Sequence, residues 1–115
     1  MTKVFDLYGI TDTDIDTAAQ ILPEALGIAF EPHDSSFGGE YYLARTENRK
    51  EKCTLKENYN QMEEDWNERA FQQYPLLLNV SLSDATIARA KELEQQLKQV
   101  MGTRIYLLER KEFNN

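Results

Sequence analysis

The last third of the chain contains the pattern that most restricts the possible folds: a strand, a helix and a second strand in succession. Residues 76–82 form an apolar run that is typical of a central strand with both faces covered. An apolar stripe at helical spacing follows over 84–101, with Ser83 as the expected N-cap and Gly102 as the expected end. Residues 104–110 predict a second strand, and a right-handed crossover should place it parallel to the first.

The first two thirds predict shorter elements of both kinds. Residues 4–8 are rich in β-forming side chains and should end at Gly9. A second apolar stripe over 11–26 predicts a helix that breaks just before Pro23, which lacks a backbone donor, and that stops at Gly27. Its candidate N-caps are Thr11, Asp12 and Thr13. Further strands are predicted at 28–31, at 40–45 and, near a sheet edge, at 52–59; residues 32–39 are expected to form a turn and 60–74 a loop with one helical turn.

These elements together predict an α+β fold. We expect a two-layer sandwich in which a mixed, mostly antiparallel sheet of five to six strands carries two helices on one face. A length of 115 residues favours a single globular domain over 1–115, and the 41% hydrophobic content is enough to form its core. No apolar run approaches the ~20 residues that span a bilayer, and no signal-type stretch follows Met1, so a cytoplasmic protein is expected.

Acidic residues are concentrated in the first third of the chain. Residues 1–40 contain eight acidic side chains against Lys3 alone, whereas 41–70 and 71–115 are nearly balanced, so the first segment accounts for the net charge of −7. Proteins that bind nucleic acid or anionic membranes need clustered Lys and Arg, which is the reverse of this distribution. We therefore expect a basic partner and no direct contact with nucleic acid or membrane. Acidity that only keeps the protein soluble is the alternative.

The residues that most often supply catalysis are poorly placed for it. Cys53, the only cysteine, lies at an apolar position of a predicted strand, where a thiol behaves as a small apolar side chain. His33, the only histidine, has Asp34 beside it, but no Gly-x-Ser-x-Gly motif supplies a nucleophile, so an exposed loop histidine is expected. No calcium-loop, phosphate-loop or zinc spacing is present. We predict no catalytic residue, no metal and no cofactor.

A tryptophan among acidic residues makes 63–68 a candidate partner-binding segment. Tryptophan is enriched among interface anchors, and hydrated carboxylates should hold this segment near the surface. The predicted partner contacts are Glu40, Tyr41, Tyr42, Glu63, Glu64, Asp65, Trp66 and Glu68. The alternative is that Trp66 completes the core and the acidic residues form a solvated face. If these residues do not contact the partner, Asp12, Asp14 and Asp16 are the next candidates.

Three segments resemble small immunity proteins of bacterial polymorphic toxin systems, including contact-dependent growth inhibition systems. The resemblance covers about residues 28–80 and is carried by Glu31 to Tyr42 (EPHDSSFGGEYY), Glu57-Asn58 and Tyr74 to Leu78 (YPLLL). It implies a cytoplasmic, non-enzymatic protein that binds the C-terminal domain of a cognate toxin, often a nuclease, and blocks its active site or substrate groove. An acidic inhibitor suits a basic nuclease cleft. The alternatives are a small acidic regulatory or ligand-binding α+β module, including a nucleic-acid mimic that inhibits a host enzyme, and an enzyme that uses carboxylates.

Overall fold

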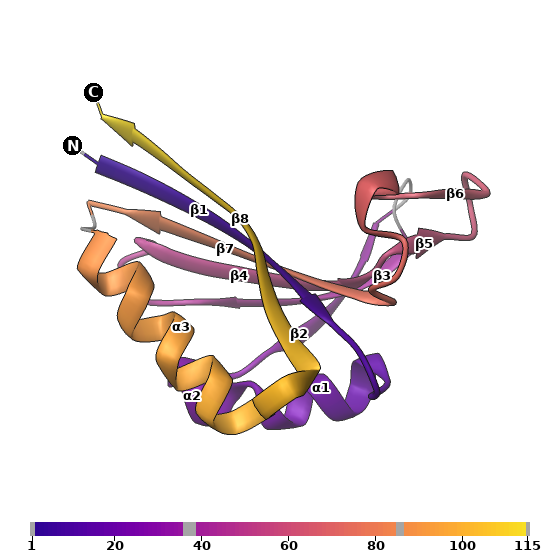
Figure 1. Cartoon of the computed structure of the whole chain (residues 1–115), viewed down its shortest axis with the longest axis horizontal. Helices are drawn as coiled ribbons and strands as arrows, with labels where there is room; N and C mark the ends of the chain where they lie inside the picture. The colour runs from indigo at the N-terminus through magenta and orange to yellow at the C-terminus, as the bar shows by residue number, and fades with distance from the viewer. Residues whose placement is uncertain (1, 36–38, 85–86, 115) are drawn as a thin grey trace.

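The fold is an α+β sandwich in which one six-stranded sheet carries its helices on one face. The computed structural model describes residues 2–35, 39–84 and 87–114. The sheet has the order β2-β3-β4-β7-β1-β8, and Figure 1 shows the helices together on one side of it. Its strands are β1 (Thr2–Ile10), β2 (Glu31–Ser35), β3 (Gly39–Arg45), β4 (Glu51–Glu57), β7 (Leu76–Ser83) and β8 (Ile105–Asn114). The predicted fold class is confirmed.

Two helical segments, side by side, cover this face. The N-terminal helix divides at Pro23 into α1 (Ile15–Ile21) and α2 (Pro23–Leu26), as predicted, and it ends at Gly27, whose φ of 73° suits glycine. The C-terminal helix α3 (Ile87–Met101) contributes Ala90, Leu93, Leu97 and Met101 to the core. The short 3-10 helix η2 (Gly102–Arg104) leads from α3 into β8.

The predicted strand–helix–strand unit is present, with one strand inserted into it. β1 lies between β7 and β8 and pairs antiparallel with both, so β7 and β8 are parallel to each other, as predicted. The expectation of a mixed sheet was wrong, because every neighbouring pair of strands among the described residues is antiparallel. The start of β1 and the end of β8 lie side by side at the end of the sheet that carries the termini (Figure 1).

Several local expectations need correction. Gly9 lies inside β1 rather than at its end, because its missing side chain makes room for Tyr74. Asp14 caps α1, since its carboxylate accepts the Thr17 N–H. The expected strand at 28–31 begins only at residue 31, and β2 continues through 32–35, the first half of the expected turn at 32–39. Residues 36–38 of that turn lie outside the described residues.

Two further expectations concern β4 and β7. β4 is an interior strand between β3 and β7, not one near an edge, and its buried Cys53 and Leu55 face the helices. Ser83 is the last residue of β7 and pairs with Lys3, so it does not cap the helix. The cause is the same in both cases: strand pairing with a distant segment overrides the local pattern.

A buried ionic network fastens the first and last strands to α3. Asp6 of β1 is 3% exposed and receives two hydrogen bonds of 2.9 Å from the Arg110 guanidinium of β8. Arg110 also binds Glu94 of α3 at 3.1 Å, and Glu94 pairs with Lys98 at 2.9 Å. The carboxylates hold the Arg110 pKa above its usual range. These contacts satisfy charges that burial alone would make costly.

Candidate functional site

Two adjoining hollows lie at the end of the sheet far from the termini, between α1, the β2–β3 hairpin and the segment after β4. The first has a volume of about 440 Å³ and the second about 410 Å³, and Ile15, Glu57, Tyr59 and Gln61 line both. The first is completed by Asp16, Pro32, His33, Asp34, Glu40, Tyr41, Tyr42, Asn60 and Met62. The second is completed by Thr13, Asp14, Trp66, Gln72, Gln73, Pro75 and Leu76. We call the two hollows together the groove.

The β2–β3 hairpin forms one wall of the groove. Neighbouring residues of a strand face opposite sides, so Tyr41 and Tyr42 take different directions, as expected. Tyr42 packs edge to face on Phe30, and its hydroxyl donates to Asp16 of α1 at 2.5 Å. This hydrogen bond raises the pKa of Tyr42. Tyr41 instead stacks on the exposed ring of His33, its partner across the hairpin.

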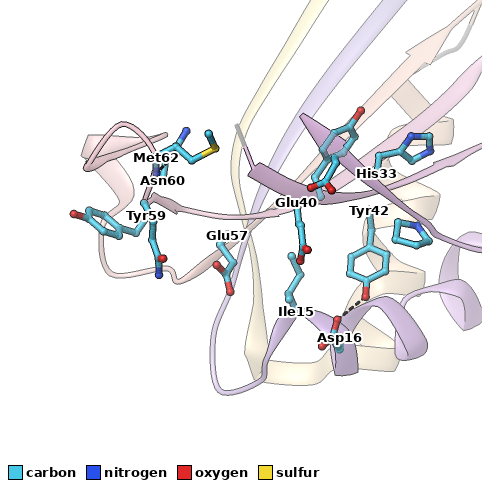
Figure 2. Close-up of a pocket in the computed structure, with 13 residues that line it drawn as sticks. Ile15, Asp16, His33, Glu40, Tyr42, Glu57, Tyr59, Asn60 and Met62 are labelled. Carbon is cyan, nitrogen blue, oxygen red and sulfur yellow. Dashed lines mark hydrogen bonds between the residues drawn. The ribbon is translucent and has the colours of Figure 1, made fainter. Parts of the chain in front are cut away.

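The first turn of α1 forms the floor. Asp14 accepts the Thr17 N–H at 2.7 Å, and this hydrogen bond lowers its pKa, so its carboxylate is held charged at the mouth of the second hollow. Asp16, two residues after Asp14, lines the first hollow. Figure 2 shows Glu40 and Glu57 extending from the hairpin and from β4 toward Ile15 and Asp16.

The segment between β4 and β7 forms the other wall. It contains the short hairpin of β5 (Tyr59–Asn60) and β6 (Asp65–Trp66), followed by the 3-10 helix η1 (Arg69–Phe71). This matches the predicted loop with one helical turn, apart from the two short strands. The rings of Tyr59 and Trp66 meet edge to face, with their centroids 5.2 Å apart. Trp66 is half-buried, which is intermediate between the exposed interface anchor and the core residue that the sequence allowed.

Of the eight predicted partner contacts, the structure gathers four around the groove. Glu40, Tyr41 and Tyr42 line the first hollow and Trp66 the second. Glu63, Glu64, Asp65 and Glu68 line neither hollow. The Arg69 guanidinium binds the Asp65 carboxylate through two hydrogen bonds and lowers its pKa, so this charge is already paired within the loop.

The groove is acidic throughout. Its lining includes five carboxylates, those of Asp14, Asp16, Asp34, Glu40 and Glu57, and within the described parts of the chain neither hollow is lined by a lysine or an arginine. The carboxylates of Asp34, Glu40 and Glu57 have no ion pair among the described residues. Apolar and aromatic side chains lie between these charges, an arrangement suited to basic polypeptide side chains that also carry apolar stems.

Sequence reasoning did not select Asp34, Glu57 and Tyr59 as partner contacts, and it kept Asp14 and Asp16 only in reserve. Glu57 and Tyr59 belong to the strand predicted at 52–59, but the sequence of a strand does not reveal what its exposed side chains face. The signal that could have found Asp14 and Asp16 is the alternating run of acids before the first helix.

The chemistry-bearing residues lie as follows. Cys53 is buried, as predicted, and burial raises its thiol pKa to about 12, which removes the reactive thiolate at neutral pH. His33 is exposed, as predicted, but on β2 rather than in a turn. In residues 2–35, 39–84 and 87–114, no three His, Cys, Asp or Glu side chains are grouped so as to hold a metal ion. No helix in the described residues is both long and apolar enough to cross a membrane.

Comparison with protein-family models and with curated proteins gives no match to this chain.

Proposed function

We propose that this protein is an immunity protein that binds the basic C-terminal domain of a cognate toxin through the groove and thereby occludes the toxin's active site or substrate groove. The observation that carries the proposal is the groove itself: five carboxylates and four aromatic rings around two adjoining hollows, with no lysine or arginine among their described lining residues. A nuclease presents the opposite charge, because it must hold a phosphate backbone.

The residues of the resemblance support the same surface. Glu31 to Tyr42, outside the undescribed 36–38, builds the hairpin wall. Glu57-Asn58 links β4 to the opposite wall, and Tyr74 to Leu78 closes that wall and enters β7. Segments that are far apart in the sequence thus meet at one site, as a shared binding function would require.

The carboxylates and the aromatic side chains of the groove contribute to binding in different ways. Exposed carboxylates attract a basic partner over a screening length of about 8 Å at physiological ionic strength, and they act mainly on the association rate. Aromatic side chains that become buried in a complex slow dissociation. Tyr59 is 41% exposed and lies beside the half-buried Trp66, so the two rings are available to a partner and already ordered.

The first test is direct. The proposal requires a gene for a toxic C-terminal domain beside the gene for this chain; that domain is expressed with this chain, and both complex formation and survival of the host cell are measured. We expect a stable complex and survival. A toxin fragment that folds, kills and does not bind this chain would overturn the proposal, and inhibition of an unrelated host nuclease would favour the nucleic-acid mimic.

The second test locates the interface. The variant D34N/E40Q/E57Q removes three unpaired groove charges. None of the three carboxylates accepts a hydrogen bond among the described residues, so the substitutions break none there. We expect association with the toxin at low salt to slow by about tenfold or more, with a weaker salt dependence. E24Q/E47Q/E112Q makes the same change in net charge at exposed positions outside the groove and should associate like the parent. Equal rates for the two variants would exclude the groove.

A further inference from the structure

The wall that carries Tyr59 and Trp66 depends on one buried side chain. Asn58 is 0% exposed, although it lies between the exposed residues Glu57 and Tyr59. Asparagine is rarely buried without several partners, because its amide group has two donor hydrogens and a carbonyl acceptor that must all be satisfied. A fully buried asparagine at the root of an exposed loop therefore indicates a specific role.

The contacts of Asn58 reach across the whole loop. Its Nδ2 lies within hydrogen-bond distance of the carbonyl oxygens of Phe71 (2.9 Å), Tyr74 (3.0 Å) and Glu68 (3.4 Å). Its Oδ1 accepts the Glu68 N–H at 2.9 Å. Its own backbone N–H donates to Pro75 and its carbonyl accepts from Asn67. One residue thus joins the end of β4 to the part of the segment that follows the β5–β6 hairpin.

We infer that Asn58 is a positioning residue that holds residues 59–74 as a preformed wall of the groove. This inference rests on the proposed function for its binding consequence. A wall that is ordered before the partner arrives costs no conformational entropy when the complex forms, whereas a loop that is open most of the time reduces the apparent affinity by the fraction of time it is closed. Asn58 would touch no partner and would act through Tyr59 and Trp66.

Hydrogen exchange on the free, full-length protein tests the holding role without any partner. In the parent, the Glu68 amide, which donates to Asn58 Oδ1, should be protected, although it lies outside the strands. N58D keeps the size and the acceptor but replaces the donor amide by a carboxylate, which repels the three carbonyl oxygens. We expect exchange over 59–74 to accelerate at least tenfold in N58D while the amides of β1 and β7 keep their protection.

N48D is the matched control, because it makes the same change of an amide to a carboxylate in the exposed turn between β3 and β4, outside the groove. The Asn48 Oδ1 accepts hydrogen bonds from the Thr46 hydroxyl and the Lys50 N–H, and a carboxylate can accept both. Its exchange over 59–74 should match the parent. Trp66, the only tryptophan, supplies an optical readout, because acrylamide should quench its fluorescence more strongly in N58D than in the parent or in N48D. If N58D does not fold, the exchange rate of the Glu68 amide in the parent tests the inference by itself. An amide that exchanges as fast as one without a hydrogen bond would overturn the inference.

The binding arm uses nona-arginine as the cationic probe. We expect N58D to bind it about tenfold more weakly than the parent and N48D, whose substitution lies outside both hollows, to bind like the parent. If exchange over 59–74 accelerates in N58D but the affinity of N58D for nona-arginine equals that of the parent, Asn58 does not position the binding site. The inference is then overturned, while the proposed function stands. If the parent binds nona-arginine no better than D34N/E40Q/E57Q does, the groove proposal fails, and hydrogen exchange still decides whether Asn58 holds the loop.

Discussion

The absence of a side chain at Gly9 allows a distant segment to pack against β1. Gly9 lies on the face of the sheet opposite the helices, paired with Leu77 and Tyr106. A Cβ placed on it would lie 2.4 Å from Cγ of Tyr74, a contact that real side chains do not make. The ring of Tyr74 therefore rests directly on the β1 backbone and fixes the point at which the loop after β4 returns to the sheet.

The first prediction follows from this contact. G9A should destabilise the fold by about 1–3 kcal/mol, because the added methyl group displaces a ring that is also held by Tyr106. Urea unfolding measures the change. In a Y74A background the same substitution should cost less than half as much, since the ring is gone. Equal costs in the two backgrounds would show that Tyr74 does not limit this position.

At the scale of elements, α3 is the part of the fold whose sequence and structure agree most closely. The stripe predicted at helical spacing is buried, with Leu93 at 3% and Leu97 at 0% exposure, and neighbouring positions such as Gln95 face solvent. Amphipathic periodicity was sufficient here because one side of the helix packs against α2, β8 and β1.

The second prediction belongs to this helix. L93A and L97A should each lower the free energy of unfolding by about 2–5 kcal/mol, through lost burial and the cavity left behind. Q95A on the exposed face should change it by less than about 0.5 kcal/mol. Chemical unfolding of the three variants measures the difference. Parent-like stability of L97A would mean that the core does not close around this helix as described.

At the scale of the whole molecule, the network of Asp6, Arg110, Glu94 and Lys98 joins the first strand, the last strand and α3. Lys98 and, after it, Arg110 hold the Glu94 pKa below its ordinary value, against the opposing effect of partial burial. A lowered pKa means that the folded state favours the charged form. The resulting stabilisation is present above pH about 4.5, the ordinary value, and is lost as the pH falls through the lowered pKa of the folded state.

The third prediction is therefore a pH dependence. E94Q should cost about 1–3 kcal/mol at pH 7, where it weakens charged hydrogen bonds, and the difference from the parent should shrink as the pH falls below 4.5. Thermal melting between pH 3 and pH 7 measures it. E24Q, at an exposed position on α2, should follow the parent across the range. A difference between E94Q and the parent that persists at pH 3 would assign the loss to packing instead of charge.

Local sequence patterns predicted five features correctly: the central apolar strand β7, the amphipathic α3, the break at Pro23, the buried Cys53 and the α+β class. Each follows from periodicity or from the chemistry of one residue, and both are properties of adjacent positions. The packing of distant segments, in contrast, places β1 between β7 and β8, makes β4 an interior strand, and brings carboxylates from α1, β2, β3 and β4 to one groove. These features depend on contacts between segments far apart in the chain, and so does the role of Asn58, whose partners lie 9 to 17 residues away. A local pattern shows that a side chain is buried or exposed, but the identity of its neighbours is decided by the packing of the whole chain.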